Sequence, residues 1–436
     1  MRPFVPLPVI PVNSPQTSSP LRPSPCPGLL GVVQALDGGI CRIKLAGGAI
    51  RADQAVAVAD AAERYAGGVI EATNRANLQI RGIGQQSTAL IESLLAVGLG
   101  PVNVAGDDVR NLMLSPSAGI DRHMLIDSRP LAREILDSLQ THARFHELSA
   151  KFAVQLDGGE ALAMLEHPHD LWLSAADRNG EPVLAFGLAG CPTDAPLAAV
   201  LLRDGHALVM AVLELFLELA RPDQTRMRHL LTEHSLDSLL QRLAERVPLF
   251  AMESWQRPTA RARLHIGSHP QRQEGLVYVG AVPALGRLDP TMLKGAAHLA
   301  EAFGDASLRL TPWQSLLLPN IRHEDSPALR QQLQALGYLV DADQTLAHLV
   351  ACTGSAGCGK GLADTKDDAR QLAERLRDQS AQVQVHLSGC SRSCACAQRP
   401  ARDTGCAALV AQPIDEDAVL ARGLGRRGDV AQRCLF

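Results

Sequence analysis

The sequence is poor in aromatic residues, which make up only 3% of its 436 positions. Proteins that bind single-stranded nucleic acid stack bases on aromatic side chains, so the composition disfavours that class. An excess of positive charge is lacking too, because the formal net charge is −4. We therefore expect neither nucleic acid nor an anionic membrane as a partner.

Long apolar runs are also missing. The most apolar stretch, 198–220, includes Arg203, Asp204, Glu214 and Glu218, which predicts a buried amphipathic helix rather than a membrane span. The first residues lack the charged and apolar regions of a secretory signal, so we expect a cytoplasmic protein.

Cysteine, in contrast, is abundant and clustered. Ten cysteines are present, and six of them lie between Cys352 and Cys406. In a reducing compartment such a cluster indicates metal or redox chemistry rather than disulfides. The hydrophobic content of 46% is ordinary for a globular protein and sufficient for a large core.

Residues 1–25 are rich in proline and lack apolar periodicity, so we predict a disordered arm. The alternation and helical spacing of apolar residues after it predict two similar α+β units, each with an antiparallel sheet. The first unit has a strand at 40–45, a helix at 52–65, two strands within 68–83 and a helix at 87–99. The second has strands at 261–266 and 274–279, a helix at 289–303, two strands within 307–321 and a helix at 326–336.

The two units align around one strand–turn–strand segment. Thr73–Ile83 matches Thr311–Ile321 in element order and length, although few residues are identical. We predict a duplicated module; the alternative is chance agreement between two small α/β units. Between the units we expect strands at 151–156 and 170–175, and helices from Gly205 onward.

The strongest local pattern is Cys352-x5-Cys358, then 31 intervening residues, then Cys390-x3-Cys394. A strand at 349–350 leads into the first pair, and a helix at 364–378 and a strand at 383–387 lead into the second. Four thiolates that converge in this way fit a [4Fe–4S] cluster, and glycines let the backbone approach it closely. A structural zinc site is the alternative, although zinc favours shorter spacings. Cys396 and Cys406 are further possible ligands or packed thiols.

Several other motifs occur in a fixed order. They are Leu45-Ala46-Gly47-Gly48, Thr73-Asn74-Arg75 with Gln79, Arg110-Asn111, Pro116-Ser117-Ala118-Gly119 and Lys151-Phe152. Together with the cysteines they resemble the sulfite and nitrite reductase superfamily. The resemblance implies an α+β fold of two ferredoxin-like half-domains and two larger α/β lobes with a pseudo-twofold internal repeat. The implied domains are the arm 1–25, half-domains 26–99 and 251–338, a first lobe 100–250 and a cluster-binding lobe 339–436.

Within that superfamily the chain is most similar to the precorrin-3B synthases, on the basis of its start, Cys26-Pro27-Gly28-Leu29, and of the segments 115–121 and 127–131. Two departures from the sirohaem reductases agree with this: Ala153 stands where they have a second lysine, and Ser391 where they often have proline.

The resemblance implies oxygen-dependent hydroxylation of precorrin-3A at C20 with γ-lactone formation, in aerobic cobalamin biosynthesis. Dioxygen and an NADH-linked electron-donor protein would be the partners, and a [4Fe–4S] cluster the relay. A mononuclear non-haem iron is a further implied cofactor. The alternative is a reductase of sulfite or nitrite, with sirohaem.

A precorrin carries many carboxylates, so its pocket needs fixed cations, and arginine binds carboxylates bidentately. The candidate tetrapyrrole-binding residues are Arg75, Gln79, Arg81, Arg110 and Lys151, with Arg42 and Arg309 as weaker candidates. Histidine is the preferred ligand for a lone iron, and the candidates are His123, His146, His167 and His169. The sequence does not identify a catalytic residue.

Overall fold

The computed structural model describes residues 26–252, 255–258, 260–376, 384–395 and 406–410. The predicted arm 1–25 and Cys396 lie outside these ranges, and so does the side chain of Cys406. In the described part of the chain, no helix combines the length and apolarity needed to cross a membrane.

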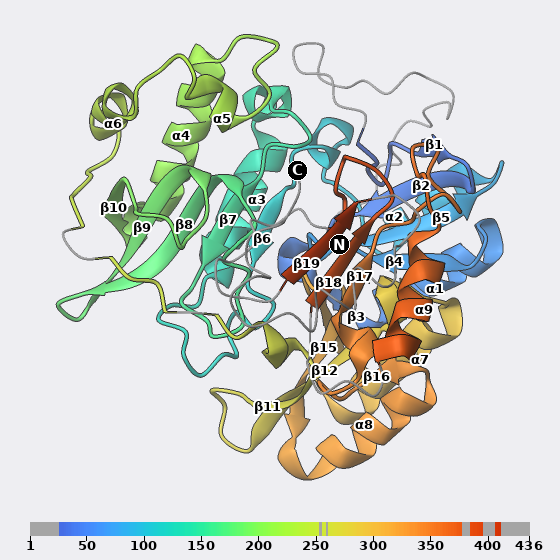
Figure 1. Cartoon of the computed structure of the whole chain (residues 1–436). Coiled ribbons are helices and arrows are strands. Elements are labelled where there is room, and N and C mark those ends of the chain that lie inside the picture. Colours follow the sequence, from blue (N-terminus) through green and yellow to red (C-terminus); the bar gives the residue numbers. More distant parts are fainter. Residues whose placement is uncertain (1–25, 253–254, 259, 377–383, 396–405, 411–436) are drawn as a thin grey trace, which may run out of the picture.

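The first half-domain is a five-stranded antiparallel sheet, completed by a strand from elsewhere in the chain, with two helices packed on it (Figure 1). Its strand β2 alternates half-buried and buried residues, as the predicted strand requires. Its elements are β1 (Val33–Ala35), β2 (Gly38–Ile43), β3 (Ala49–Arg51), α1 (Ala52–Tyr65), β4 (Val69–Ala72), β5 (Leu78–Ile83) and α2 (Ser87–Ala96).

The second half-domain repeats this order. Its elements are β11 (Gly267–Pro270), β12 (Leu276–Pro283), β13 (Arg287–Leu288), α7 (Pro290–Phe303), β14 (Ser307–Leu310), β15 (Leu316–Arg322), α8 (Ser326–Ala335) and β16 (Tyr338–Leu339). The strand predicted at 261–266 is wrong. That segment forms a 3-10 turn at Ala262–His265, because Leu264 and Ile266 donate to carbonyls three residues earlier, and β11 takes the edge of the sheet instead.

The half-domains exchange one strand each. Strand β3 pairs with β14 at the edge of the second sheet, and β13 pairs with β4 at the edge of the first. Helices α1 and α7 pack against each other through faces rich in buried alanine. Small side chains let two helices approach closely, so both half-domains share one hydrophobic core.

The backbone confirms the predicted internal repeat. Residues with positive φ recur in pairs separated by the same number of positions, and each pair occupies the same place in its half-domain. Thr73 and Thr311 begin identical turns, in which the threonine hydroxyl accepts from the amides two and four residues later. The pairs are Gly47 and Leu285, Gly48 and Gly286, Gly68 and Ala306, Ala76 and Gln314, and Gly82 and Asn320.

Lobe 1 is a five-stranded mixed sheet in the order β10-β9-β8-β7-β6, with β6, β7 and β8 parallel. The apolar stretch at 198–220 contains the buried helix α4, as predicted. Its elements are β6 (Leu112–Leu114), α3 (Arg129–Thr141), β7 (Val154–Asp157), β8 (His169–Arg178), β9 (Glu181–Gly190), β10 (Ala198–Leu201), α4 (Gly205–Leu219), α5 (Met227–Leu230) and α6 (Leu236–Ala244).

The remaining unit, here called the cysteine lobe, is a small parallel sheet in the order β17-β18-β19. One amphipathic helix, α9, covers it through Ala369, Leu372 and Ala373. Its elements are β17 (Leu349–Ala351), α9 (Thr365–Leu376), β18 (Gln384–Ser388) and β19 (Cys406–Val410). Both lobes therefore begin with a β–α–β unit of parallel strands.

We predict that Gly48→Ala destabilises the protein by about 3 kcal/mol, because a positive φ disfavours a side chain and overpacking adds to the cost. Gly48 has φ +73°, and a Cβ atom there would collide with the carbonyl oxygen of Leu310 in the other half-domain. The free energy of unfolding in urea measures the effect. Gly84→Ala is the control, since its Cβ would meet nothing within 4 Å. Equal losses in the two variants would contradict this account of the half-domain contact.

Candidate functional site

The four cysteines of the predicted cluster motif lie in two loops of the cysteine lobe. Cys352 and Cys358 follow β17, while Cys390 and Cys394 follow β18. Since β17 and β18 are parallel neighbours, their carboxyl ends meet at one edge of the sheet. The amide of Cys352 donates to the carbonyl of Leu387 at 3.0 Å, which joins the two loops at their start.

Glycines bring these loops into close contact. A Cβ atom on Gly361 would lie 2.5 Å from the backbone of Gly354, and one on Gly354 would lie 2.7 Å from the carbonyl oxygen of Ala363. Gly389 lies against the same segment, since a Cβ atom on it would lie 3.3 Å from the Cα of Gly354. The amide of Gly389 donates to the Cys352 sulfur at 3.1 Å, the kind of contact that tunes a metal-bound thiolate.

The Cys394 thiol lies in the field of the other three. Burial raises the pKa of the Cys394 thiol, and the nearby Cys352, Cys390 and Cys358 raise that pKa further. Among the described residues, no three His, Cys, Asp or Glu side chains are placed to hold one metal ion. Four cysteine thiolates on two neighbouring loops are the donor set that a [4Fe–4S] cluster requires.

A hollow with about 690 Å³ of empty space, open to solvent, borders two of these cysteines. Most of its lining is polar or charged. The lining residues are Arg42, Glu71, Ala72, Thr73, Asn74, Gln79, Leu285, Gly286, Gln314, Ala351, Cys352, Thr353, Lys366 and Cys394.

Arg42 and Gln79 form one wall of this hollow. Two guanidinium nitrogens of Arg42 donate to Oε1 of Gln79, at 2.7 and 3.1 Å. The two residues face each other across β2 and β5. Burial lowers the pKa of Arg42, although arginine keeps its charge at neutral pH. The pair thus presents a fixed cation beside the cysteines.

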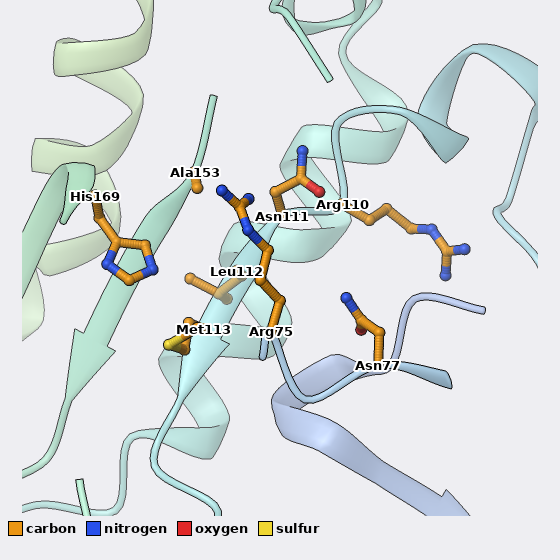
Figure 2. A pocket seen from close by; sticks show the side chains of 8 residues that line it. All are labelled: Arg75, Asn77, Arg110, Asn111, Leu112, Met113, Ala153 and His169. Carbon is orange, nitrogen blue, oxygen red and sulfur yellow. The ribbon is translucent and has the colours of Figure 1, made fainter. Parts of the chain in front are cut away.

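A second, smaller hollow includes Arg75 and Asn77, from the turn between β4 and β5 (Figure 2). It holds about 280 Å³ of empty space and is lined by Arg75, Asn77, Arg110, Asn111, Leu112, Met113, Ala153 and His169. The Arg75 guanidinium makes no hydrogen bond or ion pair with any described residue. Burial, followed by Arg226 and Arg42, lowers the pKa of Arg75 to about 10. A cation held in this way favours an anionic ligand.

His169 offers an acceptor to the same hollow. Its Nδ1 lies 2.7 Å from the carbonyl oxygen of His167, and a carbonyl only accepts, so Nδ1 carries the proton. Burial, then His167 and Arg75, lower the pKa of His169 well below its ordinary value. The imidazole is therefore neutral, and its Nε2 lone pair faces the hollow (Figure 2).

The other predicted binding residues are placed differently. Arg110 lines the smaller hollow, but its guanidinium pairs with Asp107 at 3.2 Å and points away from Arg75 (Figure 2). Lys151 is exposed and lines neither hollow. Arg309 is buried and donates to the carbonyls of Pro116 and Ala118, which fixes a loop of lobe 1.

The histidine candidates for a lone iron do not gather. The rings of His167 and His169 lie 5.0 Å apart, His146 contacts the carbonyl of Gln140, and His123 is exposed. No described third side chain completes a metal site with the first two.

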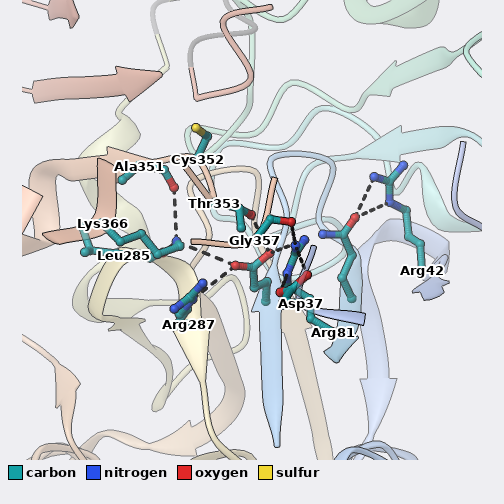
Figure 3. Close-up of polar contacts among 12 residues, drawn as sticks. Asp37, Arg42, Arg81, Leu285, Arg287, Ala351, Cys352, Thr353, Gly357 and Lys366 are labelled. Atoms are coloured by element: carbon teal, nitrogen blue, oxygen red, sulfur yellow. Dashed lines mark hydrogen bonds and ion pairs between the residues drawn. The ribbon is translucent and has the colours of Figure 1, made fainter. Parts of the chain in front are cut away.

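Arg81 lies outside both hollows and is part of a buried charge network (Figure 3). It pairs with Asp37 at 2.8 Å and donates to the carbonyl of Gly357 in the cysteine loop at 3.1 Å. Glu71 is the centre of this network, with cations from three parts of the chain around its carboxylate. These are Arg81 at 3.6 Å, Arg287 at 3.3 Å and Lys366 at 3.9 Å.

Three polar residues of the larger hollow were not among the predicted binding residues. Lys366, in the first turn of α9, donates to the carbonyls of Leu285 and Ala351, at 2.8 and 3.2 Å, and burial lowers its pKa to about 8. Asn74 and Gln314 come from the equivalent turns of the two half-domains. The repeat could have suggested Gln314, but Lys366 belongs to no recognisable motif.

Comparisons with known proteins agree with this architecture. The family described as "Nitrite and sulphite reductase 4Fe-4S domain" matches residues 105–249, and "Nitrite/Sulfite reductase ferredoxin-like half domain" matches 34–97 and 269–336. The chain is 32% identical to ferredoxin–nitrite reductase of Zea mays over 81% of its own length and 67% of that protein's. The chain belongs to the nitrite and sulfite reductase family.

Two further similar proteins carry other names. A precorrin-3B synthase from Sinorhizobium sp is 27% identical over 87% of this chain and 80% of that protein. The structure of the Mycobacterium tuberculosis NirA protein shares the fold, with a TM-score of 0.70, 23% identity and coverage of 82% of this chain and 69% of that one. The chain spans about two thirds of the length of its plant relatives, with 64% for the spinach nitrite reductase.

Membership of this family supports a [4Fe–4S] cluster as a cofactor of the chain. The segment that matches the 4Fe–4S description, 105–249, contains Cys191 as its sole cysteine. The four clustered cysteines lie outside it, and their assignment depends on the geometry of the two loops.

We predict that Glu71→Gln lowers the free energy of unfolding by about 3 kcal/mol, because breaking a buried ion pair leaves uncompensated charge. Glutamine keeps the shape of the side chain but leaves three cations without their shared anion. Urea unfolding measures the loss. Glu218→Gln is the matched control, since Glu218 pairs with Arg246 at an exposed position where the change costs below about 1 kcal/mol. Similar losses in the two variants would show that the buried network around Glu71 contributes no more to stability than the exposed Glu218–Arg246 pair.

Proposed function

We propose that this protein is a precorrin-3B synthase, which hydroxylates precorrin-3A at C20 and closes a γ-lactone at C1. The observation that carries the proposal is the larger hollow, whose wall contains both the Arg42–Gln79 pair and two of the clustered cysteines. A multiply charged macrocycle and a redox centre would be neighbours there. The precorrin-3B synthase relative, matched over 87% of this chain, supports the same assignment.

Cys352, Cys358, Cys390 and Cys394 would hold the [4Fe–4S] cluster, which supplies single electrons when it is bound. In the overall reaction one atom of dioxygen enters the substrate as the hydroxyl group. The other leaves as water, with two protons and two electrons that derive from an NADH-linked donor protein. The substrate's ring A acetate then forms the lactone.

The chain's own side chains would bind and orient the substrate. Arg75 is half-buried, and its guanidinium has no hydrogen-bond or ion-pair partner among the described residues, so a substrate carboxylate would satisfy it. The Arg42–Gln79 pair and the ammonium of Lys366 offer further contacts in the larger hollow. His169 Nε2 accepts a hydrogen bond and would favour a ligand atom that carries a proton. Ala153 places a neutral side chain in the smaller hollow in place of a lysine, and the second arginine of that hollow, Arg110, is paired with Asp107.

A sirohaem-dependent reductase of nitrite or sulfite is the second candidate. The 32% identity with the Zea mays nitrite reductase favours it, and so does the unpaired Arg75, which could equally receive a small oxyanion. Both candidates use the same fold and the same cluster site, but they differ in the tetrapyrrole, which is a bound cofactor in one case and a substrate in the other.

The functional prediction is tested on protein purified without oxygen. We expect iron and sulfide in a cluster ratio, no intense Soret band, and a hydroxylactone product after addition of precorrin-3A, oxygen and a reductant. Cys390→Ala is expected to lose both the cluster and turnover, while Cys191→Ala keeps both because it lies outside the cysteine lobe. A Soret band together with nitrite or sulfite reduction, and no hydroxylactone, would instead establish the second candidate.

We predict that Arg75→Met raises the substrate KM between about tenfold and a hundredfold, because a hydrogen bond to a charged group contributes roughly 1.5–3 kcal/mol. The iron content should not change. Substrate titration measures the effect, with Arg322→Met as the control, since Arg322 is exposed and lies 3.9 Å from Glu324. An unchanged KM in Arg75→Met would remove Arg75 from the binding site.

A further inference from the structure

The residue after the fourth cysteine is held at both of its backbone polar groups. Its amide donates to Oγ of Ser388 at 3.2 Å, and its carbonyl accepts from Nδ1 of His386 at 2.7 Å. This residue, Ala395, is 6% exposed. His386 and Ser388 are two positions apart in β18, so their side chains project from the same face of the strand.

Burial of the His386 imidazole is unfavourable, which indicates that one of its hydrogen bonds is needed. Its side chain is 3% exposed, and its Nε2 atom has no hydrogen-bond partner among the described residues. A buried polar atom without a partner is unfavourable, and an apolar side chain would avoid that penalty. The carbonyl of Ala395 only accepts, so the proton is on Nδ1. The hydrogen bond from Nδ1 to the Ala395 carbonyl is therefore the interaction that an apolar side chain at this position could not make.

Ala395 directly follows Cys394, the proposed cluster ligand whose position most needs to be fixed by neighbouring contacts. Cys394 is the most exposed of the four cysteines, and it lines the larger hollow. The residue before it, Ser393, has φ +50°, a conformation that is costly outside glycine. Cys352, by comparison, is held by its own amide, by the Gly389 amide at its sulfur, and by Thr365, which donates to its carbonyl at 2.8 Å.

We propose that His386 and Ser388 are positioning residues, which fix the Cys394 thiolate at the boundary between the cluster and the larger hollow by clamping Ala395. The proposal rests on the proposed cluster ligands. Because both clamp residues come from β18, the strand that ends beside Cys390, one element sets the positions of the third and fourth cysteines together. Partners behind metal ligands in this way tune both affinity and electronic properties.

The test compares removal of each contact with its conservative replacement in full-length protein purified without oxygen. His386→Leu and Ser388→Ala remove the clamp. His386→Asn keeps a donor near the Nδ1 position, and Ser388→Thr keeps the hydroxyl. The readouts are the rate of iron loss to a chelator and the electron paramagnetic resonance spectrum of the reduced cluster. His269→Leu, which removes the contact of a half-buried imidazole in β11 with the Ile266 carbonyl, is the control for general loss of a histidine–carbonyl contact.

We expect the Leu and Ala variants to lose iron about tenfold faster than the unaltered protein, in line with the usual effect of such partners, and to show shifted spectra. The Asn and Thr variants and His269→Leu should behave as the unaltered protein does. Iron loss at the unaltered rate in both clamp variants, or equally fast loss in the conservative variants, would overturn the proposal. Cys394→Ser serves as the reference: if it keeps an unchanged cluster, the ligand assignment fails rather than the clamp.

Discussion

The carboxylate of Glu71 is the point on which the arrangement of the site depends. This carboxylate is almost fully buried. It pairs with Arg81 from its own half-domain, with Arg287 from the other half-domain and with Lys366 from the cysteine lobe. A single buried anion cannot be removed without leaving several cations unpaired, and breaking such a pair costs more than an exposed pair contributes. The half-domains and the cysteine loops are therefore fastened at the edge of the larger hollow.

The duplicated half-domains place equivalent turns close to this junction, but the turns have different tasks. The Arg75 guanidinium has no partner among the described residues and faces the smaller hollow, whereas the equivalent Trp313 is buried and stacks on His265, with ring centroids 5.3 Å apart. Trp313 packs in an apolar cluster that includes Met113 and Tyr278. One turn thus remains open to a ligand, and the other joins lobe 1 to the second half-domain.

Periodicity and turn residues allowed much of the fold to be predicted. The helix at 52–65 was predicted at its observed bounds, and the repeat was evident from Thr73 and Thr311, because local hydrogen bonding and apolar spacing determine those features. The exchange of β3 and β13 could not be predicted, since such short strands carry no alternating pattern. The segment 261–266 alternates apolar and charged residues like a strand, yet its hydrogen bonds close locally.

The spacing of the four cysteines led to the prediction that they bind a cluster, and the structure places them on two loops at the ends of neighbouring parallel strands. The geometry around them was less predictable. The roles of arginines depend on what lies opposite them: Arg81 meets Asp37 and becomes a structural contact, while Arg42 meets Gln79 and faces the hollow. A motif specifies a residue type at a position, but the partners of a cation are determined by tertiary contacts that no local pattern records. The same reason explains why Lys366 and His386, which lie in no motif, adjoin the cysteine loops.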